Sequence, residues 1–316
     1  MKLHLQSSHL TRTLVATAAA LAVTAGAAAC SSDTSNSAND GKIVAVAAEN
    51  EYGDVLSQVG GDHVDVHSIM SNPDTDPHEF EANTDVAKQV SQAKLLVQNG
   101  VGYDDFMEKI EQANPSSDRQ VINVQKLRGL PDDTPNPHLW YDPETMPAVA
   151  DEMAKILGDI QPENKAEFTA NADKFKVALQ PWKDALAQFK QQHPDTPVAV
   201  TEPVADYLLK AAGANIRTPE TLEAAVMNDT DPSATDVEFQ NKLVEDKQVK
   251  VLLYNQQVTD DSTTDLLKKA KAAGVPVVGV YETMPEGFTY QDWMLAETKA
   301  LSDATANGTS TEQLSK

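Results

Sequence analysis

Residues 162–192 have the sequence PENKAEFTANADKFKVALQPWKDALAQFKQQ, and this stretch decides how the rest of the chain is organised. Apolar side chains recur in it at every third or fourth position, namely Phe168, Ala172, Phe175, Leu179, Trp182, Leu186 and Phe189. This period predicts one long amphipathic helix, with Pro162 near its first turn. About 30 helical residues span about 45 Å, which is enough to run along two domains. Pro181 lies inside the pattern and predicts a kink.

The segments on both sides of this helix alternate between strand-like and helix-like patterns. Strands are predicted at 42–47, 64–70, 94–98, 120–124, 197–201, 249–254 and 276–281. Helices are predicted at 84–93, 104–113, 146–160, 203–212, 237–246, 262–273 and 290–304. Gly213 and Gly274 are placed as the C-terminal caps of two of them. We therefore expect an α/β fold of two lobes with mostly parallel sheets, joined by one long bridging α-helix.

These patterns divide the chain into six parts. The predicted boundaries are a signal peptide at 1–29, a flexible tether at 30–41, an N-terminal α/β lobe at 42–161, a linking helix at 162–194, a C-terminal α/β lobe at 195–306 and a polar, loose tail at 307–316. A chain of 316 residues is long enough for one large or two ordinary α/β domains.

The N-terminus has the composition of an export signal. Lys2 and Arg12 precede a small, alanine-rich apolar run, which is too short for a good membrane-spanning helix and ends directly before Cys30. Cys30 is the only cysteine, so the chain has no internal disulfide. A cysteine in this position resembles the lipobox of bacterial lipoproteins, which implies a lipid anchor on Cys30, although Ala27 stands where leucine is preferred. The alternative is ordinary cleavage nearby, which would leave a free secreted protein.

The chain is strongly acidic. Its net charge is −23, and removal of residues 1–29 takes away two basic residues and no acidic one, which leaves −25. This charge argues against nucleic acid and anionic surfaces as partners, and it suits an exported protein that meets cations. Solubility explains part of the charge without any partner.

Two histidines follow prolines in near-duplicate surroundings. Residues 76–81 are DPHEFE and residues 136–143 are NPHLWYDP, so His78 and His138 lie in matching loops. Beyond residue 29 the chain has five histidines, so the match is informative. Imidazole beside carboxylate is a usual way to hold a divalent transition metal.

Two acidic residues follow predicted strands of the second lobe. Glu202 comes after 197–201 and Glu282 after 276–281, while His78 and His138 follow strands of the first lobe. Ligands of open α/β sheets bind beyond the carboxyl ends of the strands. The sequence thus predicts a metal site of two imidazoles from one lobe and two carboxylates from the other, with Asp292 as an alternative to Glu282.

Ordinary structural roles compete with this interpretation. Each histidine can be a plain loop residue, Glu202 an acid in the first turn of a helix, and Glu282 a solvated loop acid. For any one of the four residues, an ordinary structural role explains its position as well as metal binding does. For all four at equivalent strand ends, metal binding is the better explanation. The sequence has no GxSxG motif, phosphate-binding glycine loop or CxxC, and the residues after His78 do not complete HExxH.

The same motifs resemble those of the zinc/manganese type of metal-specific solute-binding lipoproteins of bacterial ABC importers. Residues 76–81 and 136–143 are similar to the first two ligand motifs of that family. Residues 201–208, TEPVADYL, resemble the third, and residues 281–283, YET, resemble the fourth, in which Asp is more usual than Glu. The resemblance covers essentially the whole chain after the export signal. Pro181 departs from it, because the family's linking helix is usually uninterrupted.

The resemblance implies two α/β lobes with a metal ion buried between them, and His78, His138, Glu202 and Glu282 as ligands. The protein would then not be an enzyme. It would be a monomer, anchored by lipid to the extracytoplasmic face of the cell membrane, that hands Zn²⁺ or Mn²⁺, with Fe²⁺ also suitable, to an ABC permease. Two alternatives stay open, namely a metal-dependent hydrolase with an open coordination position and a binding protein for a non-metal solute.

Overall fold

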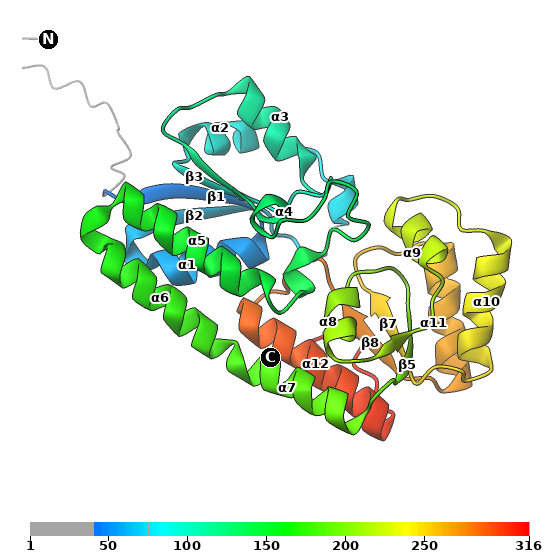
Figure 1. The fold of residues 1–316 in the computed structure, drawn as a ribbon. Helices are drawn as coiled ribbons and strands as arrows, with labels where there is room; N and C mark the ends of the chain where they lie inside the picture. Colours follow the sequence, from blue (N-terminus) through cyan, green and yellow to red (C-terminus); the bar gives the residue numbers. More distant parts are fainter. Residues whose placement is uncertain (1–40, 75, 316) are drawn as a thin grey trace, which may run out of the picture. The chain divides into compact units, whose positions relative to one another are not determined.

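The computed structural model describes residues 41–74 and 76–315 (Figure 1). The predicted signal peptide, Cys30 and all of the predicted tether except Gly41 lie outside the described residues. Within those residues, no helix has the length and apolar composition needed to cross a membrane.

The first lobe is built on a parallel sheet with the strand order β2-β1-β3-β4. Its strands are β1 (Ile43–Glu49), β2 (Val64–Met70), β3 (Leu95–Gln98) and β4 (Gln120–Asn123). Its α-helices are α1 (Asn50–Gly60), α2 (Thr84–Gln92), α3 (Asp105–Ala113), α4 (Val124–Leu127) and α5 (Thr145–Ile160). Every residue of β3 is buried, as is typical of a strand covered on both faces.

The second lobe is also built on a parallel sheet, with the strand order β6-β5-β7-β8. Its strands are β5 (Pro197–Val200), β6 (Asn215–Ile216), β7 (Val251–Asn255) and β8 (Val277–Val280). Its helices are α8 (Asp206–Ala211), α9 (Glu220–Met227), α10 (Ala234–Glu245), α11 (Asp261–Ala273) and α12 (Tyr290–Asn307). The predicted α/β class with two mostly parallel sheets is confirmed.

The elements predicted on either side of the linking helix are present, with ends that differ by at most three residues. The prediction did not include α1, α4, α9 and β6. Helix α1 follows β1 without an intervening loop and contains Gly53, which lowers helix propensity. Strand β6 has two residues, which is too short to show a period.

The long central helix is present and is interrupted once. A short 3-10 turn (Pro162–Asn164) leads into α6 (Lys165–Ala178), and α7 (Gln180–Gln192) follows after Leu179. Pro181 has no N–H to donate to the turn before it, and the N–H of Leu179 bonds Phe175 O and Val177 O instead. Helix α6 packs on α1 and α5 of the first lobe, whereas α7 packs on α8 and α12 of the second (Figure 1).

The prediction of a loose C-terminal tail is wrong for its described part. Thr311 forms a parallel bridge with Val278, in which Gly279 N donates to Thr311 O at 2.8 Å and Thr311 N donates to Val277 O at 2.8 Å. A side chain at Gly279 would meet the carbonyl oxygen of Glu312 at 2.0 Å, so only glycine permits this approach. The tail therefore continues the sheet beside β8.

Candidate metal centre

The structure places all four predicted residues beyond the carboxyl ends of strands. His78 lies in a 3-10 turn (Pro77–Glu79) after β2, and His138 directly precedes another (Leu139–Tyr141). Glu202 follows β5, and Glu282 follows β8. Two histidines of the first lobe thus face two carboxylates of the second.

Three of the four residues form one cluster. Glu282 Oε2 lies 3.3 Å from His78 Nε2 and 3.3 Å from His138 Nε2. One nitrogen of each histidine and one oxygen of Glu282 all lie within 4.8 Å of one another, which is close enough to share a metal ion. Among the residues that the structure describes, no other group of three His, Cys, Asp or Glu side chains converges in this way.

The two histidine loops share one local geometry. Asp76 Oδ1 accepts a hydrogen bond from His78 N at 2.8 Å, and Asn136 Oδ1 accepts one from His138 N at 2.9 Å. In both loops a short polar side chain therefore closes a turn over the proline. This turn explains why the two motifs are near duplicates, because it fixes the backbone of each histidine.

His138 is oriented by its surroundings. Its side chain is fully buried, and its Nδ1 lies 2.8 Å from Asn136 Oδ1, which leaves Nε2 facing Glu282. Asn136 in turn donates to Pro203 O at 2.7 Å, next to Glu202. A hydrogen bond to the second ring nitrogen is the usual way in which a metal-binding histidine is held.

Glu202 lies outside the three-residue cluster and has one oxygen without a partner. It is 2% exposed, and its Oε1 accepts from Asn255 Nδ2 at 2.5 Å. The same Asn255 nitrogen donates to Glu282 Oε1 at 2.7 Å, so this amide joins the two carboxylates. Glu202 Oε2 is buried and has no hydrogen bond. A buried carboxylate oxygen of this kind is costly unless a cation or proton satisfies it.

Asp292, the alternative to Glu282, lies elsewhere. It is in the first turn of α12, where its backbone N–H donates to the capping side chain of Thr289. Glu282 is the acid that lies between the histidines, and Asp292 is not in the cluster.

In the metal-free state, His78 and Glu202 hold protons more strongly than usual, whereas Glu282 holds one less strongly. Burial lowers the pKa of His78, but the hydrogen bond and charge of Glu282 outweigh burial and raise this pKa to about 9. Burial acts to raise the pKa of Glu282, but the hydrogen bonds and charges of His138 and His78 hold it far below its ordinary value. Burial, followed by the charge of Glu282, raises the pKa of Glu202 well above its ordinary value. A cation that binds here would displace protons from His78 and Glu202.

Three side chains that were not predicted hold Glu282 in place. Asn255, the last residue of β7, joins it to Glu202. Gln257 Oε1 accepts from Glu282 N at 2.6 Å and from Thr283 N at 2.8 Å. The Tyr103 hydroxyl donates to Glu282 Oε2 at 2.8 Å. The position of Asn255 and Gln257 at the end of a predicted strand was the only signal in the sequence, and nothing marked Tyr103.

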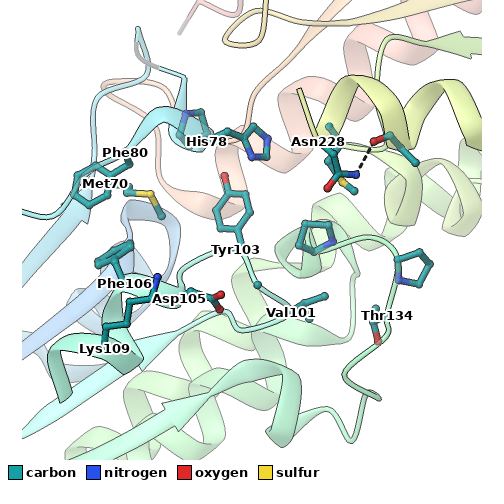
Figure 2. A pocket seen from close by; sticks show the side chains of 16 residues that line it. Met70, His78, Phe80, Val101, Tyr103, Asp105, Phe106, Lys109, Thr134 and Asn228 are labelled. Atoms are coloured by element: carbon teal, nitrogen blue, oxygen red, sulfur yellow. Dashed lines mark hydrogen bonds between the residues drawn. The ribbon is translucent and has the colours of Figure 1, made fainter. Parts of the chain in front are cut away.

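The site opens to one side, at His78. A cavity of about 590 Å³ adjoins it, lined by His78 and Tyr103 of the first lobe and by Asn228 of the second, among others (Figure 2). Figure 2 shows the Tyr103 ring beside His78 with its hydroxyl on the side of the histidine. The side chain of His78 is 25% exposed, whereas those of His138 and Glu282 are fully buried. His78 is thus the member of the cluster that a solute reaches first.

Two parallel-sheet lobes, a linking helix and a histidine–carboxylate cluster where the lobes meet define a class of protein, the two-lobed solute-binding proteins with a helical link. The chain belongs to the family described as zinc-uptake complex component A, periplasmic, whose model matches residues 45–304.

Curated relatives carry the names of metal-binding lipoproteins. The manganese-binding lipoprotein MntA of Bacillus subtilis is 24% identical over 266 residues, which is 81% of this chain and 85% of that protein. The metal ABC transporter substrate-binding lipoprotein SsaB of Streptococcus sanguinis is 29% identical over 155 residues, which is 45% of this chain and 50% of that protein. The chain thus spans about half the length of SsaB and most of MntA.

Solved structures share the fold. The periplasmic zinc binding protein TroA of Treponema pallidum has a TM-score of 0.70 at 17% identity, over 85% of this chain and all of that one. The Mn-bound periplasmic metal binding protein of Candidatus Liberibacter asiaticus has a TM-score of 0.68 at 17% identity, over 84% of this chain and all of that one. At these identities the likeness establishes the two-lobed architecture.

Proposed function

We propose that the protein captures a divalent transition metal ion, Zn²⁺ or Mn²⁺, between its lobes and delivers it to the membrane permease of an ABC importer. His78 and His138 each give one neutral nitrogen, while Glu202 and Glu282 give anionic oxygens. The observation that carries this proposal is the convergence of His78 Nε2 and His138 Nε2 on one oxygen of Glu282, beside the unpartnered buried oxygen of Glu202.

The charges support a cation as the solute. Two ionised carboxylates neutralise a dication, and neutral imidazoles add no charge. Without a cation, the structure has Glu202 buried beside Glu282, which is unfavourable for two anions. Zinc, manganese and iron all accept a set of two nitrogen and two carboxylate ligands. The names of relatives include manganese and iron, and that of a structural neighbour includes zinc.

A carrier fits the site better than a metal-dependent hydrolase. Four protein ligands close a tetrahedral shell, whereas a hydrolase needs an open position and a general base near it. Glu79, the acid next to His78, is exposed, and the three side chains that converge are all proposed ligands. The protein is therefore assigned no reaction.

Delivery to a permease implies a place outside the cytoplasmic membrane. The relatives named above are lipoproteins, and the sequence around Cys30 is suited to the same anchor. We propose a monomer held by lipid at Cys30 on the extracytoplasmic face, with residues up to Gly41 as a tether.

Thermal unfolding of the metal-stripped protein, titrated with Zn²⁺, Mn²⁺ and Fe²⁺, tests the proposal. A ligand at about 100 times its dissociation constant stabilises the folded state by about 2.7 kcal/mol, which is readily measured. A His78→Ala/Glu202→Ala double variant should lose this stabilisation. If no metal stabilises the protein, or if the double variant responds equally, the metal site is wrong and a non-metal solute becomes the better explanation.

A further inference from the structure

One face of α1 bonds to the segment that follows Glu282. Asn50, Asp54 and Gln58 are spaced four residues apart, so they lie along one face of the helix. Asp54 Oδ2 accepts from Tyr290 N at 2.9 Å, and the amide groups of Gln58 and Gln291 bond each other reciprocally at 3.0 Å. These hydrogen bonds join the first lobe to residues 284–291 of the second.

Asn50 makes the bonds nearest to the candidate metal centre. Its Nδ2 donates to Met284 O at 2.9 Å, and its Oδ1 accepts from Met284 N at 2.9 Å. Asn50 therefore pairs with both backbone groups of a residue only two positions from Glu282.

The backbone from Glu282 to Met284 is thus held by two side-chain amides from different lobes. Gln257 of the second lobe accepts the N–H groups of Glu282 and Thr283, and Asn50 of the first lobe accepts the N–H group of Met284. Three consecutive N–H groups have side-chain acceptors, so the path of this segment depends on those two side chains.

Met284 is buried, but it and the four residues after it border a cavity. This cavity of about 460 Å³ is lined by residues 284–288, residues 71–74 and Asn50. Because the cavity separates the two loops, they do not fill the space against each other. Asn50 therefore bonds Met284 at the edge of this cavity, where residues 71–74 do not pack against the backbone that follows.

We propose that Asn50 is a positioning residue for metal capture. By fixing Met284 to the first lobe, it holds Glu282 beside His78 and His138, which belong to that lobe, and so slows the departure of the metal ion. This inference rests on the function proposed above. It adds that the affinity for the metal ion and its rate of release depend in part on a side chain that does not contact the metal.

The test compares Asn50→Ala with Gln58→Ala. Both variants remove a reciprocal amide bond between the same two segments, but only Asn50 bonds beside Glu282. The dissociation constant and dissociation rate of Mn²⁺ and Zn²⁺ are measured, together with thermal unfolding of the metal-free proteins. We expect Asn50→Ala to release metal about tenfold faster and to bind it about tenfold more weakly, with Gln58→Ala unchanged within about twofold. Asn50→Asp keeps the acceptor for Met284 N but sets a carboxylate oxygen against Met284 O, so it should also release metal faster than wild type.

Equal metal release from Asn50→Ala and wild type overturns the inference, as does an equal loss in Asn50→Ala and Gln58→Ala. If Asn50→Ala does not fold, Asn50→Asp is compared with wild type instead. Metal release from Asn50→Asp at the wild-type rate likewise overturns the inference. Failure of the wild-type protein to bind either metal would instead reject the proposed function, so the two failures are distinguished by the wild-type titration.

Discussion

His78 Nε2 lies 3.3 Å from Glu282 Oε2, so a histidine of one lobe and a carboxylate of the other form an ion pair at the candidate metal centre. The pair binds a proton where the proposed function requires a metal ion, because the pKa of His78 is raised to about 9. Metal and proton therefore compete for the same nitrogen.

Metal affinity should rise with pH well above the ordinary range of histidine. His78 must lose its proton to bind metal, and its pKa is about 9, so each unit of pH between about 6 and 8.5 should strengthen binding at least about tenfold, and more wherever Glu202 also releases a proton. Titration calorimetry with Mn²⁺ at several pH values, in buffers of different ionisation enthalpy, measures the affinity and the proton release. Affinity that levels off near pH 6.5 would contradict this assignment.

Glu202→Gln should change metal affinity and metal-free stability in opposite directions. Removing one anionic ligand should weaken Mn²⁺ or Zn²⁺ binding by at least about a hundredfold. Burial beside Glu282 disfavours the charge of Glu202 without metal, so the neutral amide should stabilise the metal-free protein. Denaturant unfolding and metal titration of the same preparation check both effects. A variant that binds metal like wild type would remove Glu202 from the site.

Asn255→Ala should weaken metal binding without removing a ligand. The change leaves Glu202 Oε1 and Glu282 Oε1 without the amide that joins them, and loss of such support costs metal sites about 10- to 100-fold in affinity. Asn164→Ala is the matched control, because Asn164 is a partly buried amide that bonds Gln161 and His63 in another part of the chain. Equal affinity of the two variants would show that Asn255 has no special role.

Glu297→Gln should reduce the pH dependence of stability. Burial raises the pKa of Glu297 to about 8, although hydrogen bonds from Trp293 and Tyr141 oppose it. The folded protein thus holds a proton that the unfolded chain releases above pH about 4.5, so this group lowers stability as pH rises from about 4.5 to 8. The effect approaches 1.4 kcal/mol per pH unit at most.

The glutamine variant keeps an acceptor for both hydrogen bonds and does not titrate. Its free energy of unfolding, measured by denaturant at pH 5, 6, 7 and 8, should fall less steeply than that of wild type. Parallel slopes for the two proteins would show that Glu297 is ionised in the folded state throughout this range.

The sequence predicted the features that depend on local periodicity. The apolar positions of 162–192 predicted the linking helix, and Pro181 predicted its interruption. The two proline-containing loops marked His78 and His138 as candidate ligands, because each loop contains a residue, Asp76 or Asn136, that closes its turn. Such patterns are visible because neighbours in the chain produce them.

Features that depend on distant contacts were not predictable. Asn50 acquires its role from Met284, and Tyr103 acquires its role from Glu282, in each case from the other lobe. The ordered tail was missed for the same reason, since Thr311 is polar and its order comes from the edge of β8. Amino-acid type alone carries no sign of such pairing.

The two sheets have the same strand order, in which the second strand of each lobe lies at one edge and the fourth at the other. The fourth strand leads to His138 in the first lobe and to Glu282 in the second, so one topological position supplies a proposed nitrogen ligand in one half and a proposed oxygen ligand in the other. Because the two lobes share one strand order, a substitution in one lobe can change the balance of nitrogen and oxygen ligands. The backbone of the other lobe then stays as it is. Cargo preference can therefore diverge between related proteins without any change in their scaffold.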